Sequence, residues 1–180
     1  CVLHADGPGG SPGRAAYVQW HNGLTTPLEC ALHRFVECPL AHPTFMFRRE
    51  VAARLGGYRY GPFPEDYELI LRWTAHGVGL GKVSEPVLIW RDSPTRLSRQ
   101  DPRYVPSAMY ALKSPFLAQW LNAHNPHHPD VVVLGAGRES RKRVKWLERE
   151  GIRIAAFADI QPHKMGQILQ GRRVISVHDL

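Results

Sequence analysis

The sequence predicts an α/β protein with two parts, and three observations lead to this. Helical patterns alternate with short apolar, β-branched runs along most of the chain. A polar, proline-containing segment at residues 123–129 interrupts this alternation. After it, an apolar run leads directly into a glycine turn. We therefore expect a first part at residues 1–122, a linker at 123–129 and a second part at 130–180.

The first part begins with a stretch rich in Gly and Pro, after which aromatic and β-branched residues favour a short strand at residues 17–20. The sequence Thr26-Pro27-Leu28-Glu29 is a capping box with Pro at the first helical position, which predicts a helix to about Cys38. A second helix is expected at residues 49–55, ended by Gly56-Gly57 in the left-handed conformation.

The apolar positions from residue 65 to 76 surround most of a helix, which a Pro-rich turn precedes. Short strands are expected at residues 78–83 and 86–90. Asp101-Pro102 then starts a long helix, kinked at Pro115, that ends near Leu121.

The second part contains the pattern of a Rossmann-like βαβ unit. A strand at residues 131–134 is followed by Gly135-Ala136-Gly137, a helix at 141–150 and a strand that ends at Asp159. Gly135 and Gly137 would let backbone amides approach a pyrophosphate, and Asp159 is spaced to reach a ribose hydroxyl. Nucleotide or NAD binding is one interpretation, and a ligand-free structural module is the other.

Composition excludes several classes of protein. The formal net charge is +7, but no nucleic-acid-binding motif accompanies it, and the dense run at 138–145 is typical of a solvated helix face, so no nucleic-acid partner is expected. Three cysteines without CxxC spacing predict neither a disulfide framework nor a zinc site, which favours a reducing, cytoplasmic setting. The histidines of residues 124–128 lack a second metal-ligand cluster, and no apolar run is long enough for a transmembrane segment.

Two adjacent carboxylates, Glu65 and Asp66, stand at the predicted start of the helix at 65–76. At this place they can be helix-capping residues that the macrodipole stabilises. The Gly/Pro-rich loop before them would also place them at the rim of a cleft, where a carboxylate can act as a general base toward a hydroxyl.

Four blocks of sequence resemble the second half of family 2 glycosyltransferases, across about residues 15–120. They are His42-Pro43-Thr44-Phe45-Met46-Phe47-Arg48-Arg49, then Leu55-Gly56-Gly57-Tyr58-Arg59, then Glu65-Asp66-Tyr67-Glu68-Leu69, and then Glu85-Pro86-Val87-Leu88 with Trp90-Arg91. The resemblance implies a GT-A fold and transfer of a sugar from a nucleotide-sugar to a hydroxyl, with inversion. Residues 131–175 resemble the Rossmann-like domain appended to some bacterial glycosyltransferases and sugar-modifying acyltransferases.

The resemblance also implies roles for individual residues. Asp66 matches the general base of the family, and Glu65 would help to position the acceptor or the base. The expected substrate-binding residues are His42, Thr44, Arg91, Arg96 and Ser98, of which the last three would meet the donor diphosphate. The alternatives are a structural role for His42 and Thr44, and pairing of the loop arginines with local carboxylates. The family holds a divalent metal, Mg²⁺ or Mn²⁺, with an Asp-x-Asp motif that this chain lacks. We therefore expect no metal ligand in this chain. We also expect a donor-binding half upstream of Cys1, without which the chain is inactive.

The expected function is therefore that of a glycosyltransferase in bacterial glycan or polysaccharide synthesis, with a nucleotide-sugar donor and a saccharide or lipid-linked acceptor. Such a protein would have no transmembrane segment, and peripheral membrane contact is compatible with it. The alternative is a non-catalytic nucleotide- or dinucleotide-binding regulatory module, for which the first part would serve as a scaffold.

Overall fold

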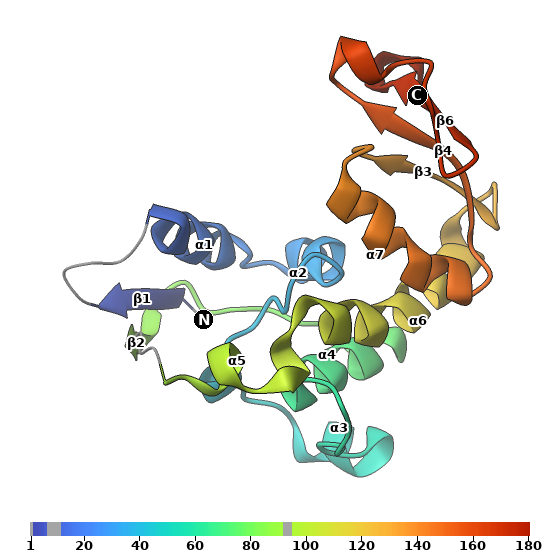
Figure 1. Cartoon of the computed structure of the whole chain (residues 1–180). Coiled ribbons are helices and arrows are strands. Elements are labelled where there is room, and N and C mark those ends of the chain that lie inside the picture. Colours follow the sequence, from blue (N-terminus) through green and yellow to red (C-terminus); the bar gives the residue numbers. More distant parts are fainter. Residues whose placement is uncertain (1, 7–11, 92–94) are drawn as a thin grey trace. The chain divides into compact units, whose positions relative to one another are not determined.

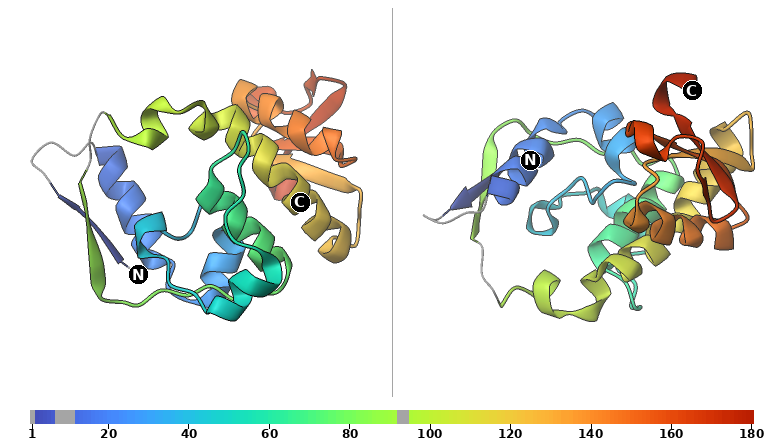
Figure 2. Two further views of the ribbon diagram at one scale, coloured as in Figure 1. Left: turned by 90° about the horizontal axis from the view of Figure 1, so that it is seen from below. Right: turned by 45° about the horizontal axis from the view of Figure 1, so that its top comes forward.

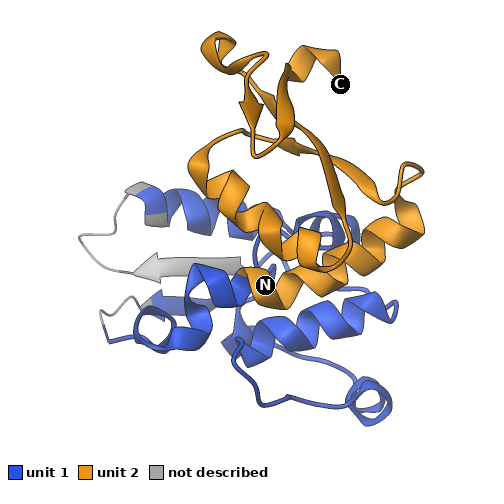
Figure 3. Ribbon diagram, turned by 45° about the vertical axis from the view of Figure 1, so that its right-hand side comes forward, with its two compact units in different colours: residues 1–109 blue, residues 110–180 orange. Residues whose placement is uncertain are grey.

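The computed structural model describes residues 2–6, 12–91 and 95–180, without the side chains of residues 2–6, 12, 14 and 91. The chain divides into two compact units, residues 1–109 and 110–180 (Figure 3). The boundary lies inside helix α6 (Pro106–His124), whereas the sequence placed it at residues 123–129. Since Ala118 and Leu121 belong to the hydrophobic core of the second unit, the greater part of this helix belongs there too.

Unit 1 combines short helices with one pair of strands. Its elements before α6 are β1 (Val2–Asp6), α1 (Pro12–Gly23), α2 (Pro27–His33), the 3-10 turn η1 (His42–Thr44), α3 (Arg49–Leu55), α4 (Glu65–Ala75), β2 (Pro86–Arg91), α5 (Leu97–Gln100) and the 3-10 turn η2 (Pro102–Tyr104). Strands β1 and β2 pair in parallel, and α1 lies along them in each view (Figures 1 and 2).

The predicted helices at residues 49–55 and 65–76 and the strand at 86–90 are confirmed to within one residue. The capping box is confirmed as well, because the Thr26 hydroxyl accepts from the Glu29 N–H while the Glu29 carboxylate accepts from the Thr26 N–H at 2.8 Å. These hydrogen bonds lower the pKa of Glu29 to about 2. The helix they start is shorter than predicted, since α2 ends at His33.

The predicted strand at residues 17–20 is wrong, because these residues lie in α1. Val18 and His21 are buried three residues apart on one helix face, and the rings of Tyr17 and His21 lie 5.9 Å apart. The predicted strand at residues 78–83 is also absent from this described segment. Glycines alternate through it, so it offers few side chains for pairing. Strand β1 was not predicted.

The core of unit 1 gathers residues from α4 and from the segments around α2. It consists of Leu24, Cys30, Ile70 and Leu80, with Trp20, Cys38, Leu40 and Phe45 packed against them. Burial of these apolar side chains fixes α4 against the chain that surrounds it. The helix that carries Glu65 and Asp66 is therefore part of the packed interior.

Unit 2 contains the βαβ unit that the sequence predicted. After α6 follow β3 (Asp130–Leu134), α7 (Arg138–Arg149), β4 (Arg153–Asp159), the 3-10 turn η3 (Pro162–Lys164), β5 (Ile168–Leu169), β6 (Arg172–Ser176) and the 3-10 turn η4 (Val177–Asp179). The sheet has the order β3-β4-β6-β5, in which β3, β4 and β6 are parallel and β5 is antiparallel. The described chain is thus an α/β protein with a small, mostly parallel sheet.

One face of strand β3 is covered and the other is exposed. Val131 and Val133 of β3 pack with Val144 of α7 and with Phe157 of β4, which is fully buried. The alternate residues Val132 and Leu134 are exposed. The side of β3 that faces α7 therefore belongs to the core of unit 2.

Candidate functional site

A cavity of about 610 Å³ in unit 1 brings together four of the residues that the sequence singled out. His42, Asp66, Arg96 and Ser98 all line it, although they are far apart in the sequence. Aromatic side chains line it too, namely Tyr17, Trp90 and Tyr104. A concave site with a few convergent polar groups between aromatic walls is typical of a small-molecule site.

Helix α4 holds Asp66 at the cavity because both of its ends are anchored. Asp66 is the second residue of the helix, and the buried Pro64 is its N-cap residue. The turn before the helix therefore sets where Asp66 lies in space. One residue later, the hydroxyl of the buried Tyr67 donates to the carbonyl of Arg34 at 2.6 Å. This hydrogen bond connects the first turn of α4 to the chain that follows α2.

The other anchor is Arg72, whose role as a buried ion-pair partner the sequence analysis did not predict. Its guanidinium donates to both oxygens of Glu68 at 2.8 and 3.0 Å, and each of these side chains is 5% exposed. It also donates to the carbonyls at the end of α3, namely Leu55, Gly56 at 3.1 Å and Gly57 at 2.7 Å. A buried charge this well paired holds its helix in one position. The i, i+4 spacing of an acid and an Arg within an apolar helix was the signal that could have revealed it.

The carboxylate of Asp66 is only 17% exposed, and this burial raises its pKa above the ordinary value. The N–H of Tyr67 and the charge of His42 counteract the rise, whereas Glu65 adds to it. A carboxylate with a raised pKa is a better proton acceptor than an ordinary aspartate.

His42 stands between Asp66 and Tyr58. It opens the turn η1, in which Pro43 sets the backbone angle and Phe45 N–H donates to the His42 carbonyl at 3.1 Å. Its Nδ1 lies 3.9 Å from Asp66 Oδ2, and its Nε2 lies 2.9 Å from the Tyr58 hydroxyl. Tyr58 follows the glycines that end α3, and no role was predicted for it.

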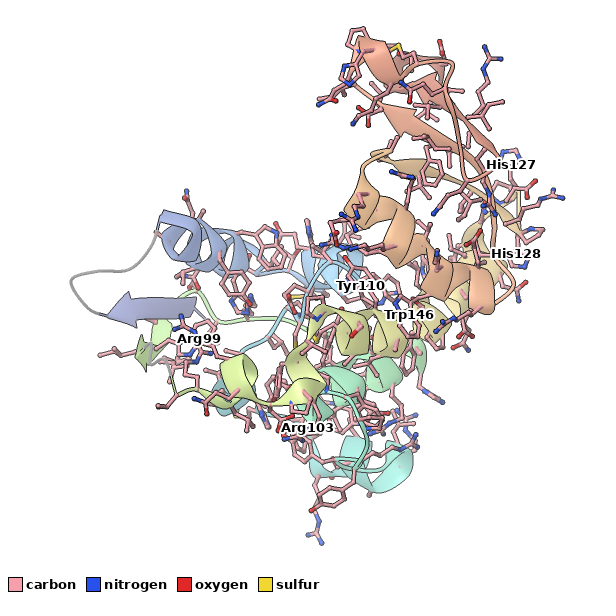
Figure 4. The ribbon with its side chains drawn as sticks, in the orientation of Figure 1. Arg99, Arg103, Tyr110, His127, His128 and Trp146 are labelled. Carbon is pink, nitrogen blue, oxygen red and sulfur yellow. The ribbon has the colours of Figure 1, made fainter. Side chains whose placement is uncertain are left out.

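Glu65 does not line the cavity. Its Oε2 accepts from Arg103 Nη1 at 2.9 Å, and Arg103 also pairs with Asp101 at 2.8 Å (Figure 4 labels Arg103). This connects α4 to the turn η2, which carries Tyr104 into the cavity. Burial, followed by the charges of Asp66 and Glu65, raises the pKa of Tyr104 to about 12, so the phenol stays protonated and can donate a hydrogen bond.

The other predicted substrate-binding residues are placed differently. The guanidinium of Arg96 lies 4.3 Å from the Trp90 ring, and Ser98 and Arg99 lie beside it on the cavity wall. Arg99 was not predicted. Thr44 uses its hydroxyl to donate to the Ala41 carbonyl at 2.6 Å and lines a neighbouring cavity of about 790 Å³. The side chain of Arg91, at the end of β2, lies outside the described part of the chain.

The described residues were also tested for a metal site. Among them, no group of three His, Cys, Asp or Glu side chains could hold an ion. His127 and His128 are exposed on the loop between α6 and β3 (Figure 4). The thiol of Cys38, beside the cavity, donates to the Leu40 carbonyl at 3.3 Å, and burial raises its pKa.

In unit 2 the glycine turn has the expected place, but Asp159 has a structural role that the sequence analysis did not predict. Gly135 has a φ of 91° and a side chain there would crowd Ser140, so only glycine fits, whereas Gly137 has an ordinary φ of −67° and open space around it. The buried Asp159 carboxylate accepts from the N–H of Ala136 at 2.9 Å, the N–H of Gln161 at 3.0 Å and Lys164 at 2.9 Å. These donors hold its pKa well below the ordinary range. The carboxylate oxygens of Asp159 thus accept hydrogen bonds from within the protein. A ribose hydroxyl would have to displace one of these donors in order to bind.

Comparisons with known protein families, with curated proteins and with solved structures find no match. In the described part of the chain, no helix combines the length and the apolar composition needed to cross a membrane.

Proposed function

We propose that unit 1 provides the acceptor side of a glycosyltransferase active site, with Asp66 as the general base. The observation that carries this proposal is the convergence of His42, Asp66, Arg96 and Ser98 on one cavity. The resemblance to family 2 glycosyltransferases implies a role for each of the four. Burial of the Asp66 carboxylate supports the proposal further, because it makes this group a stronger base.

The proposed reaction is a displacement at the anomeric carbon of a nucleotide-sugar. The acceptor hydroxyl forms the new C–O bond while the bond to the nucleoside diphosphate breaks on the opposite face of the sugar. Asp66 takes the hydroxyl proton as the new bond forms, and the diphosphate leaves with the electron pair. The phenol of Tyr104 is kept protonated and can orient the acceptor by donating to one of its oxygens.

The leaving diphosphate is anionic, and the cavity wall offers it cations. Arg96, Ser98 and Arg99 are close together in the sequence, and they line the cavity together with Trp90. An Arg side chain can bind phosphate oxygens through two parallel hydrogen bonds. The divalent ion that the resemblance implies would neutralise further charge on the diphosphate.

The test is release of nucleoside diphosphate from a panel of nucleotide-sugars, with saccharide and lipid-linked acceptors, by the protein that carries this chain. We expect Asp66→Asn to lower turnover on the order of 100- to 10,000-fold, the usual contribution of a general base. Asp130→Asn, which removes an exposed carboxylate in unit 2, is the control and should leave turnover unchanged. Full turnover by Asp66→Asn would refute the assignment of the base, and no turnover of any donor by the unaltered protein would refute the function.

A second candidate function belongs to unit 2, where the tight turn at Gly135 stands between β3 and α7 as in nucleotide-binding βαβ units. This alternative predicts saturable binding of NAD or a mononucleotide, measurable by calorimetry on the folded chain. Nucleotide binding by unit 2 is the weaker candidate function. Asp159, the residue expected to bind a ribose hydroxyl, already accepts hydrogen bonds from three donors within the protein.

A further inference from the structure

Three side chains from separate segments form a row that begins at the proposed base. Asp66 belongs to α4, His42 to η1 and Tyr58 to the segment after α3. The Nδ1 of His42 lies 3.9 Å from Asp66 Oδ2, a distance that permits electrostatic attraction but no direct hydrogen bond. The Nε2 of the same ring lies 2.9 Å from the hydroxyl of Tyr58, within hydrogen-bond distance.

The groups around Asp66 differ in the sign of their effect. Those that face it or line its cavity are Glu65 and Tyr67 from α4, His42 from η1, Tyr58, Tyr104 from η2, Cys38 and Glu37 from the segment after α2, Arg96 and Arg99 near α5, and Tyr17 and His21 from α1. The charge of His42 favours the ionised carboxylate, whereas burial and Glu65 disfavour it. A positive imidazole beside the carboxylate therefore opposes the cost of burying it.

The ring of His42 is held in a defined orientation. Its centroid lies 5.2 Å from the Tyr58 ring and 5.2 Å from the Phe45 ring, and the Tyr58 hydroxyl meets Nε2. When the Tyr58 O–H donates to Nε2, the proton of the neutral imidazole lies on Nδ1, toward Asp66. When the ring is protonated, this orientation holds its positive charge beside the carboxylate of Asp66.

We infer that His42, oriented by Tyr58, is a positioning residue that keeps the buried carboxylate of Asp66 ionised and so able to accept a proton. The catalytic meaning of this inference rests on the proposed function. The electrostatic coupling itself needs no substrate. It can therefore be tested even if the chain transfers no sugar.

The experiment is an NMR titration of the Asp66 carboxyl carbon in the intact chain, for the unaltered protein and for His42→Gln. We expect the Asp66 pKa to move upward by about one unit, the usual effect of removing an opposite charge at this distance. His76→Gln is the matched control, because His76 follows the other end of the same helix. An Asp66 titration in His42→Gln that coincides with the control would overturn the inference.

Tyr58→Phe provides a second test, since it keeps the ring and removes only the hydroxyl. We expect ¹⁵N shifts of His42 to change from one dominant neutral tautomer to a mixture, with a smaller upward shift of the Asp66 pKa. If the His42 tautomer is the same without the hydroxyl, Tyr58 does not orient the ring and that part of the inference is rejected. This test also covers the case in which His42→Gln does not fold.

The inference and the proposed function can fail separately. If the titration moves as expected but Asp66→Asn keeps full turnover, the coupling exists and the base has been misassigned. If turnover depends on Asp66 but the Asp66 pKa is the same in His42→Gln as in the unaltered protein, the proposed function is supported and the inference is rejected. In an active protein, His42→Gln should also move the acidic limb of the kcat/KM profile to higher pH.

Discussion

Asp66 in unit 1 stands at the start of a helix, and Asp159 in unit 2 stands at the end of a strand. Both are shielded from solvent, yet their environments shift the pKa of the carboxyl group in opposite directions. Asp159 accepts from two backbone N–H groups and a lysine, and its pKa is lowered. Asp66 faces a cavity, accepts from the neighbouring Tyr67 N–H, and has a raised pKa. A carboxylate whose lone pairs are used within the protein stabilises structure, whereas one that is desolvated with few donors retains the capacity to take a proton.

The largest expected effect comes from removing the anchor of the Asp66 helix. Arg72→Met leaves the buried Glu68 with only the mostly exposed Arg59 at 3.7 Å, and it removes a donor from each of the carbonyls of Leu55, Gly56 and Gly57. We expect it to destabilise unit 1 by about 3–5 kcal/mol, the usual cost of breaking a buried ion pair. Urea unfolding followed by tryptophan fluorescence measures this.

Arg59→Met is the control for this change, because Arg59 approaches Glu68 at 3.7 Å but its side chain is 60% exposed. We expect it to cost about 0–1 kcal/mol, as for other exposed pairs. If both variants cost equally little, α4 is held by apolar packing alone, and the rigid placement of Asp66 must have another cause.

The next effect concerns Asp159, where Asp159→Asn should lower the thermal unfolding midpoint of unit 2 by several degrees. In the unaltered protein both carboxylate oxygens of Asp159 accept hydrogen bonds. The Asn side chain replaces one of these oxygens with an NH₂ group, which cannot accept, so at least one hydrogen bond is lost. Differential scanning calorimetry at pH 7 measures the change. Asp130→Asn, at an exposed pair with Arg153, should have little effect and serves as the control.

The pH dependence of Asp159 has a definite sign. Because its folded pKa lies below the unfolded value, its contribution to stability is present above pH 4 or so and is lost as the pH falls below that value. Asp159→Asn should therefore differ most from the unaltered protein at pH 7 and least near pH 3. A difference that grows toward acid would contradict the hydrogen-bond arrangement at this residue.

The smallest effect on stability is expected at Asp66. Its folded pKa is raised, so ionisation of this group lowers stability as the pH rises above the ordinary range of an aspartate. Asp66→Asn should therefore keep or slightly increase the free energy of unfolding at pH 7, with a smaller difference at pH 3. Chemical unfolding at both values measures it, and a clear loss of stability at pH 7 would give Asp66 the structural role assigned to Asp159.

Much of the local structure could be predicted from the sequence. The capping box at Thr26, the helix that starts at Glu65 and the strand, glycine turn and helix around Gly135 all formed as predicted. These elements depend on interactions within a few residues, which the sequence displays directly. The region at residues 17–20 was misjudged because its aromatic side chains favour strands locally, while burial of Val18 and His21 within unit 1 makes the segment part of a helix.

The candidate site was predictable in its members but not in their connections. Asp66, His42 and Arg96 were singled out, but Tyr58, Arg103 and Tyr104 were not, although they set the surroundings of the two carboxylates. Nothing in the residues around Tyr58 indicates that its hydroxyl meets His42, sixteen positions away. Such contacts arise where loops fold back on α4, and no local pattern encodes them.

The sequence by itself determined which carboxylates stand at the starts and ends of elements, because capping residues, glycine turns and apolar periodicity are local properties of the chain. Only the tertiary structure decided which of them is saturated with donors and which faces a cavity. The physical reason is that the pKa and the free lone pairs of a carboxylate depend on burial and on partners from distant segments. Asp66 and Asp159 look alike in sequence, and their three-dimensional surroundings make them different.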